Sequence, residues 1–263
     1  MLEDTKTGGA APLDIGRFLS GGPIDSTLVT ERLPFTVRMV SSSTELAKAV
    51  SIRHAAYTRH VPQFAQSLAT PEVQDNEAGF VVLLAESKID GSPLGTMRIQ
   101  VNRFRPLVLE QSVELPEWLR HRRLAEATRL GVIESRVGRL VTTVLFKAFY
   151  LYCMRNSVEW MVVAGRSPID RQYDRLMFAD VYPELGYIPL AHAGNLLHRV
   201  MSFDVPGAQD LWQAAAHPLY NFIVRTNHPD IDVGPARTWG GQAESLKVQN
   251  FSTVLGKIAV KNL

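Results

Sequence analysis

Cysteine is almost absent from this chain: Cys153 is the single one in 263 residues. One thiol excludes an internal disulfide framework and any metal site built from several cysteines. A chain without disulfides fits a reducing compartment, and we therefore expect a cytoplasmic protein. The seven histidines are scattered and show no spacing that predicts a metal site, so we expect no metal centre.

Charge of one sign and long apolar runs are also scarce. The formal net charge is +2, which gives no overall attraction to nucleic acid or to a membrane. No run reaches the roughly 18 consecutive apolar residues of a membrane span, which leaves membrane-surface association as the remaining kind of membrane contact. The N-terminus is polar and has no apolar signal core. Neither a Gly-x-Ser-x-Gly elbow nor a phosphate-loop lysine motif is present.

The apolar fraction of 46% supports a substantial core in one large domain or one domain with extensions. We expect a flexible arm over residues 1–33, with one short helix near Ile15–Leu19. The main domain is expected over 34–204. A C-terminal extension over 205–263 would be helical to about residue 225 and poorly patterned from Asn227 onward.

Hydrophobic periodicity and turn residues predict the elements of the main domain. Strands are expected at 35–40, 79–86, 94–101, 124–132 and 159–164, with a bent hairpin or bulged strand over 188–203. Helices are expected at 44–59, 140–156 and 167–177, the last with Ser167 as its cap and Pro168 at its first position. Long connections cover 60–78 and 102–121. This order predicts an α/β fold with a mixed, mostly antiparallel sheet that has helices on its faces.

The strand Leu124-Ala-Glu-Ala-Thr-Arg-Leu-Gly-Val132 carries the first candidate site, because it places an acid and a base in an apolar run. Alternation along a strand puts Glu126 and Thr128 on one face, and Ala127 and Arg129 on the other. Burial raises the pKa of a carboxyl group toward neutrality, where it can act as a general base. The alternative is a buried structural pair between Glu126 and Arg129.

A second candidate site is the turn Glu134-Ser-Arg-Val-Gly-Arg139, which joins a strand to a helix. The free N–H groups of a first helical turn attract anions, and Arg136 and Arg139 add charge-assisted contacts. Gly138 allows a tight turn. The pattern therefore predicts a phosphate or pyrophosphate site, and the alternative is an ordinary turn with solvated arginines.

Three further side chains are candidates. Arg98 and Arg53 lie in elements that pack on the core, near Glu126 and Arg129, and such a group suits recognition of a carboxylate. A salt-bridge network that stabilises the sheet would explain them equally. Tyr173, near the middle of a helix, is placed to donate a proton to a leaving thiolate, or is a core tyrosine. The Arg120-His-Arg-Arg123 cluster is either solvated or a docking site for an acidic partner.

These residues resemble the GNAT-type N-acyltransferases. Tyr173-Asp-Arg-Leu-Met-Phe178 is similar to the Tyr-x-x-Leu-Gly-Phe element of that superfamily. The segment from Arg136 to Val141 resembles its Arg/Gln-x-x-Gly-x-Gly/Ala pyrophosphate loop, although only Arg136 and an offset Gly138 match it.

A narrower resemblance covers about residues 35–203. Four elements recur in the same order in the acyl-homoserine-lactone (autoinducer) synthases and in the long-chain N-acyl amino acid synthases. They are Arg53-x-x-x-Tyr57, the acidic loop with Glu72 and Asp75, Gly95-Thr-Met-Arg98 and Glu126-x-Thr-Arg129. The Gly-Thr-Met-Arg element is more similar to the N-acyl amino acid synthases, and Phe64 stands where autoinducer synthases usually carry a tryptophan.

The resemblance implies a GNAT-like fold and transfer of a fatty acyl group to an amine. The donor would be a thioester of acyl carrier protein or of coenzyme A, with no tightly bound cofactor, and the acceptor an amino acid or a similar small amine. Glu126 would deprotonate the acceptor, Tyr173 would protonate the thiolate, and Arg98 and Arg129 would orient Glu126 or bind the acceptor carboxylate.

The resemblance also assigns residues to the two substrates. Arg53, Tyr57 and Asp75 are expected to bind substrate. Arg136, Gly138 and Arg139 would hold the phosphopantetheine phosphate. The acyl chain would lie in a tunnel between the sheet and helix 140–156, lined by side chains that include Phe146 and Phe149. An acidic carrier protein would contact Arg120, Arg122 and Arg123.

Three alternatives remain at this stage. An autoinducer synthase would use S-adenosylmethionine, bound by the N-terminal segment and the acidic loop. A short-chain acetyltransferase would have a closed tunnel beside Phe149. A non-catalytic domain that binds acyl chains or carrier protein would keep its function when Glu126 is replaced by glutamine.

Overall fold

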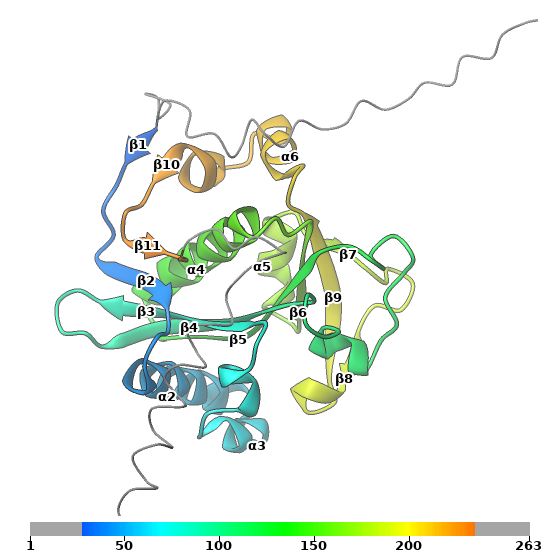
Figure 1. Ribbon diagram of the computed structural model, residues 1–263, viewed down its shortest axis with the longest axis horizontal. Helices are drawn as coiled ribbons and strands as arrows, with labels where there is room; N and C mark the ends of the chain where they lie inside the picture. The colour runs from blue at the N-terminus through cyan, green and yellow to red at the C-terminus, as the bar shows by residue number, and fades with distance from the viewer. Residues whose placement is uncertain (1–27, 235–263) are drawn as a thin grey trace, which may run out of the picture.

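The computed structural model describes residues 28–234 of the chain (Figure 1). The short helix expected near Ile15–Leu19 lies outside the described residues, as does the tail beyond residue 234. Residues 28–33, at the end of the expected arm, include the two-residue strand β1 (Val29–Thr30).

One nine-stranded sheet organises the fold, with the strand order β11-β2-β3-β4-β5-β6-β9-β7 and β8 paired with β9. The sheet is mostly antiparallel, and its parallel pairs are β5 with β6 and β11 with β2. Its strands are β2 (Phe35–Met39), β3 (Phe80–Ser87), β4 (Pro93–Val101), β5 (Leu124–Val132), β6 (Trp160–Gly165), β7 (Ala179–Asp180), β8 (Ile188–Leu190), β9 (Leu196–Asp204) and β11 (Ile231–Asp232). The mixed α/β sheet predicted from the sequence is thus confirmed.

Two long helices cover opposite faces of this sheet (Figure 1). Helix α2 (Ser43–His60) begins at a cap in which Ser42 accepts a hydrogen bond from the backbone N–H of Glu45. Helix α4 (Arg136–Arg155) lies on the other face and connects β5 to the parallel strand β6. Alternation along β4 separates the two environments: Met97 and Ile99 belong to the apolar core around α4, whereas polar Thr96, Arg98 and Gln100 alternate with them.

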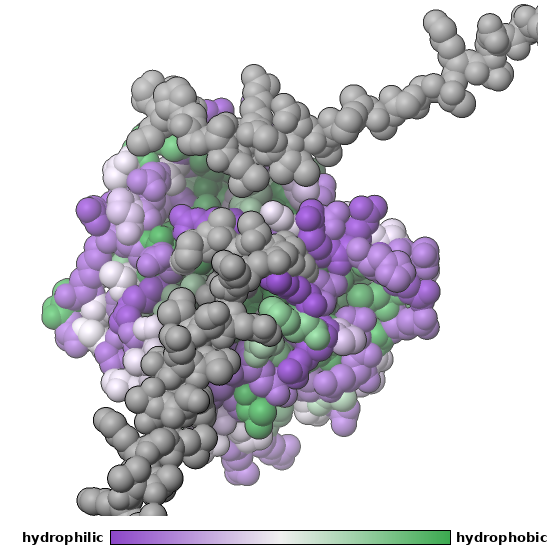
Figure 2. Space-filling model, in the orientation of Figure 1, coloured by the Kyte–Doolittle hydropathy of each residue, from purple (hydrophilic) through white to green (hydrophobic). Residues whose placement is uncertain are grey.

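Helix α4 is long and apolar enough to cross a membrane by length and composition. Two thirds (67%) of its most apolar window is buried inside the fold, however, because the helix packs on the sheet. On the face shown in Figure 2, the hydrophobic residues of the described surface lie in small groups between hydrophilic ones.

Two helices begin at residues other than those predicted. Helix α4 starts at Arg136, four residues before the expected Leu140, because Ser135 caps it and accepts a hydrogen bond from the N–H of Gly138 at 3.1 Å. The segment expected as a turn is therefore the first turn of this helix. Helix α5 (Asp170–Arg175) is shorter than predicted, since residues 166–169 form a turn closed by the Ile169 N–H on the Arg166 carbonyl.

The residues between the long helices and strands form short helices. The connection over 60–78 contains α3 (Pro62–Ala65), η1 (Gln66–Leu68) and η2 (Val73–Asn76), and the connection over 102–121 contains η3 (Val108–Gln111). The bend predicted at Gly194–Asn195 is present between η4 (Ala191–Ala193) and β9, with φ of 69° at Gly194 and 56° at Asn195.

Residues 205–234 cover the outer side of α4 (Figure 1). They form α6 (Ala208–Ala214), the π-helical turn η5 (Asn221–Arg225), β10 (Thr226–Asn227) and β11. The poor patterning expected after residue 227 misses β11, which pairs in parallel with β2. The buried Lys147 connects α4 to this layer. Its ammonium contacts the carbonyls of Phe222 and Thr226 at 2.6 and 2.5 Å, and the Nδ1 atom of His228 at 2.7 Å.

Gly138 provides a test of how α4 meets the preceding strand. A Cβ atom at this position would lie 2.0 Å from the carbonyl oxygen of Ile133, so one of the two backbones would have to move. We expect Gly138→Ala to lower the free energy of unfolding by about 1–3 kcal/mol, the usual effect of overpacking. Urea denaturation measures this, with the exposed neighbour Arg139→Ala as the control; equal stability of the two variants would contradict the prediction.

Candidate active site

The parallel strands β5 and β6 separate partway along their length. Their ladder pairs Leu124–Ala127 with Trp160–Val163 and stops there, although β5 continues to Val132 and β6 to Gly165. Backbone groups beyond the last pair are no longer held by the neighbouring strand. The opening between these strands is therefore a place where a substrate can meet the backbone in the centre of the sheet.

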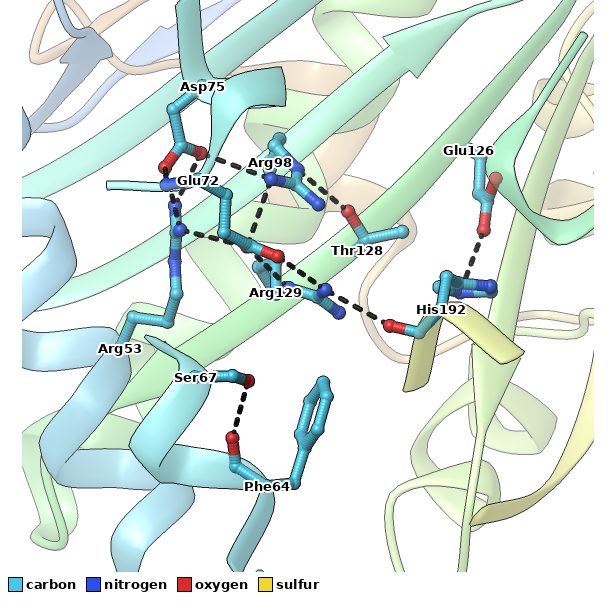
Figure 3. A network of polar contacts seen from close by, with 10 residues as sticks. All are labelled: Arg53, Phe64, Ser67, Glu72, Asp75, Arg98, Glu126, Thr128, Arg129 and His192. Carbon is cyan, nitrogen blue, oxygen red and sulfur yellow. Dashed lines mark hydrogen bonds and ion pairs between the residues drawn. The ribbon is translucent and has the colours of Figure 1, made fainter. Parts of the chain in front are cut away.

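A β-bulge in β5 lies at this opening. The register with β4 passes from Thr128 opposite Arg98 to Gly131 opposite Thr96, so two residues of β5 face the single residue Met97. Arg129 is the extra residue and has a positive φ of 56°. The alternation predicted for this strand is consequently wrong at Arg129: its side chain joins the face of Glu126 and Thr128, as Figure 3 shows.

Glu126 is completely buried next to the bulge. Its Oε2 atom accepts a hydrogen bond from the N–H of Leu109 at 3.2 Å, and its Oε1 atom has no hydrogen-bond partner among the described residues. The Nε2 atom of His192 lies 3.6 Å from Oε1. Burial raises the pKa of Glu126 to about 8, against the opposing influence of the Leu109 N–H, Arg98 and Arg129, so the carboxyl is mostly protonated at neutral pH.

Five charged side chains form what we term the arginine–carboxylate cluster: Arg53, Glu72, Asp75, Arg98 and Arg129 (Figure 3). Glu72 is its centre and accepts from Arg53 at 3.2 Å, from Arg98 at 3.0 Å and from Arg129 at 2.7 Å. Asp75 pairs in a bidentate way with Arg53, both contacts being 2.9 Å, and accepts from Arg98 at 3.2 Å. Three guanidinium groups thus face two carboxylates, which leaves one positive charge in excess.

The arginine–carboxylate cluster links the segments that meet on this face of the sheet. Although burial raises the pKa of Glu72 and of Asp75, the arginines lower both below their ordinary values. Asp75 connects the loop over 72–76 to Arg53 of α2, and Arg129 connects Glu72 to the His192 carbonyl at 3.1 Å. In the described part of the chain, the polar contacts of Arg129 therefore go to Glu72 and His192, and the Glu126–Arg129 pair considered from the sequence does not form.

Tyr57 and Tyr173 approach the opening from different elements. The ring of Tyr173 lies against Gly165, the last residue of β6, where a Cβ atom would be 2.7 Å from it. Burial, Tyr57 and Asp170 raise the pKa of Tyr173, so its phenol keeps its proton at neutral pH. Burial raises the pKa of Tyr57, on α2, and the nearby positive charge of Arg129 opposes this rise. The Phe64 ring lies 5.2 Å from the Arg129 guanidinium.

The residues predicted for the acyl donor lie elsewhere on the same fold. Arg136 and Arg139 are exposed on the first turn of α4, whereas Gly138 between them is buried against Ile133. Phe146 and Phe149 are buried in the apolar core between α4 and the sheet. A cavity of about 480 Å³ lies apart from these residues and is lined by Glu110, Ser112, Val113, Glu114, Leu115 and Arg120.

His192 and the central position of Glu72 were not found from the sequence. His192 belongs to a turn far along the chain from Glu126, and a histidine without a spaced partner carries no signal of its own. Glu72 was recognised as part of an acidic loop, but its contact with three arginines depends on α2, β4 and β5 meeting in space. The backbone carbonyl of His192 and the backbone N–H of Leu109 also contribute contacts, and a pattern of side chains cannot predict these.

Comparison with solved structures decides the fold. FeeM, an N-acyl amino acid synthase from uncultured soil microbes, superposes with a TM-score of 0.54 at 18% identity, over 72% of this chain and 96% of that one. The chain has a GNAT-like fold. The resemblance predicted from the sequence is thus confirmed at the level of the fold.

Two further solved structures superpose less well. BjaI, a CoA-dependent acyl-homoserine lactone synthase, has a TM-score of 0.49 at 13% identity over 82% of this chain and 99% of that one. FdhC, a nucleotide-linked sugar GNAT, has a TM-score of 0.44 at 9% identity over 70% and 94%. No protein-family model and no curated protein matches the chain.

Proposed function

We propose that this GNAT-fold protein is an N-acyltransferase that moves a long-chain fatty acyl group from a thioester to the amine of an amino acid or a similar small amine. One observation carries the proposal. The buried carboxyl of Glu126 lies beside the opening between β5 and β6, next to a cluster with one guanidinium in excess. A buried carboxyl can act as the base, and free backbone groups between the separated strands can bind the thioester carbonyl. Excess positive charge can bind the carboxylate of an amino acid.

The chemistry follows from the positions of these groups. Glu126, once ionised, takes a proton from the acceptor ammonium, and the free amine attacks the thioester carbonyl. The carbonyl oxygen gains negative charge, which backbone N–H groups at the opening would stabilise. The C–S bond then breaks, and Tyr173 gives its phenolic proton to the leaving thiolate and takes up the second proton that the acceptor nitrogen loses. Because burial raises the pKa of Tyr173, the phenol is protonated before the step.

The surplus charge supports an acceptor that carries a carboxylate. Arg98 and Arg129 are held in place by Glu72, so they are already oriented before a substrate arrives. An amino acid would place its carboxylate toward this cluster and its ammonium toward Glu126. An amine without a carboxylate would leave the surplus charge uncompensated, and we expect it to be the poorer acceptor.

The donor would be acyl carrier protein or coenzyme A carrying the acyl thioester. Arg136 and Arg139, which are exposed at the start of α4, would contact the phosphate of the donor, and the helix dipole would add to their charge. The acyl chain would enter the apolar layer that contains Phe146 and Phe149. Arg122 and Arg123, which are about half exposed, extend the surface for an acidic carrier protein.

The experiment is mass spectrometry of lipids from a host that expresses the full chain, compared with the Glu126→Gln variant. We expect long-chain N-acyl amino acids that vanish in the variant. Purified protein is then assayed with acyl carrier protein and coenzyme A thioesters, with and without S-adenosylmethionine. A product that requires S-adenosylmethionine would identify an autoinducer synthase instead, and no acylated amine with any donor would refute the acyltransferase.

A further inference from the structure

Acyl transfer to an ammonium has a proton balance that Glu126 alone cannot complete. The ammonium nitrogen loses two protons when it becomes an amide; one ends on the thiol, and the other must leave to solvent in every turnover. Glu126 would take up the proton that must leave to solvent, yet its side chain has 0% exposure. The carboxyl therefore needs a neighbouring group through which the proton reaches water.

His192 is the side chain placed for this task. Its Nε2 atom is 3.6 Å from Glu126 Oε1, a few tenths of an ångström beyond a hydrogen bond, and its side chain is 10% exposed. Glu126 Oε1 and His192 Nδ1 are both buried and have no hydrogen-bond partner among the described residues. Buried polar atoms normally have hydrogen-bond partners. Two such atoms without partners on adjacent side chains therefore indicate a route for a water molecule or a proton.

The backbone holds His192 in this position. Its carbonyl accepts a hydrogen bond from Arg129 at 3.1 Å, and the N–H of the preceding Ala191 donates to Ser112 at 2.8 Å. Gly194, with a φ of 69°, then turns the chain into β9. The bulge arginine and the η3 side of the fold therefore both fix the turn that carries the imidazole next to Glu126.

Burial and the surrounding charges keep the imidazole neutral. Burial, followed by the positive charges of Arg129, His198 and Arg98, lowers the pKa of His192 to about 4, against the opposing influence of Glu72. Arg98, Arg129 and Glu110 are the charged groups that act on Glu126 in the same region. A neutral imidazole can accept a proton at one nitrogen and release one from the other, so it transmits a proton without retaining it.

We propose that His192 is the proton relay of Glu126. The O–H bond of the carboxyl breaks as an N–H bond forms at Nε2, and the proton on the buried Nδ1 passes to a water molecule that enters beside this atom. The ring then returns to its first tautomer by exchange with water. The result is an ionised Glu126, ready for the next acceptor, and a neutral His192. The role rests on the proposed acyltransferase, and His192 acts through Glu126 as a positioning residue.

The first test needs no activity. Ring signals of His192 are followed by NMR between pH 5 and pH 10 in the full chain and in Glu126→Gln. We expect a shift in the wild-type protein with a midpoint of about 8, as the adjacent carboxyl ionises, and no such shift in the variant. The signals of His198 serve as the internal comparison. A His192 ring that does not sense a titration near pH 8 would overturn the relay.

The second test is chemical rescue of His192→Ala. We expect kcat to fall roughly 10–100-fold with KM within about twofold, and added imidazole to restore activity several-fold by entering the vacated space. His198→Ala removes a second buried imidazole from the same hairpin, and imidazole should not restore what it loses. If His192→Ala does not fold, His192→Gln replaces it, with the solvent isotope effect on kcat as the readout.

The two tests separate the possible failures. A wild-type protein that acylates no amine refutes the proposed function, and the NMR shift then still decides whether Glu126 and His192 are coupled. An active protein whose His192→Ala variant keeps full activity, or loses activity that imidazole does not restore, refutes the relay and leaves the acyltransferase standing.

Discussion

Replacing Glu126 by glutamine is expected to lower kcat by about 10²–10⁴-fold while the protein remains folded. The amide oxygen can still accept the N–H of Leu109, so the buried position keeps its hydrogen bond and loses only the ability to take up a proton. The measurement is steady-state acyl transfer with purified protein, with circular dichroism as the control for folding. An active Glu126→Gln variant would remove Glu126 from the mechanism.

The pH dependence of the same pair of proteins identifies the base. Because burial raises the pKa of Glu126 to about 8, the ionised form is a minority at pH 7 and increases about tenfold per pH unit below 8. We therefore expect kcat/KM of the wild-type protein to rise with pH and to level off above about 8. The acceptor ammonium also loses its proton as pH rises. Glu126→Gln separates the two effects, because its residual activity keeps only the pH profile of the acceptor.

The second large effect concerns stability. Arg53→Met should lower the free energy of unfolding by about 3–5 kcal/mol, since Asp75 would remain buried without its bidentate partner. Both side chains have 0% exposure, so water cannot replace the lost contact without rearrangement. For a chain of this size the midpoint of thermal unfolding should fall by about 10 °C.

Arg59→Met is the matched control, because Arg59 lies on the same helix and its side chain is 30% exposed. Its ion pair with Glu134 is long, at 3.6 Å, and the Glu134 side chain is 82% exposed. Such a pair contributes at most about 1 kcal/mol. Similar losses for the two variants would mean that Arg53 contributes through its aliphatic stem and not through the cluster.

These two experiments probe different properties of one polar face. Glu126 is kept out of the arginine–carboxylate cluster and therefore retains a raised pKa, whereas Glu72 and Asp75 are inside it and have lowered ones. An arginine lowers the pKa of a carboxylate paired with it, which makes that carboxylate a weaker base. An unpaired buried carboxyl lowers the stability of the fold. In the proposed acyltransferase, this separation would let the cluster orient the acceptor while Glu126 acts as the base.

Much of the fold was predictable from local patterns. The boundaries of β5, Leu124–Val132, are those expected, because a mostly apolar run begins directly after the polar cluster at 120–123. The order of strands and helices also followed from periodicity, since a period of two or of 3.6 residues records which side of each element faces the core. The start of α4 was predicted four residues too late, because Gly138 was interpreted as a turn residue, whereas Ser135 caps the helix in the structure.

The sequence by itself determined the composition of the site: Glu126, Arg98, Arg53 and Tyr173 were candidates because charged or phenolic groups in apolar elements need a reason to be there. Only the tertiary structure decided which of them meet. The bulge at Arg129 reverses the face expected from alternation, and it depends on the register with β4, which no local pattern reports. The approach of His192 to Glu126 likewise depends on the hairpin folding back across the sheet. Local sequence encodes which way a side chain faces, whereas a contact between distant segments is set by packing of the whole chain.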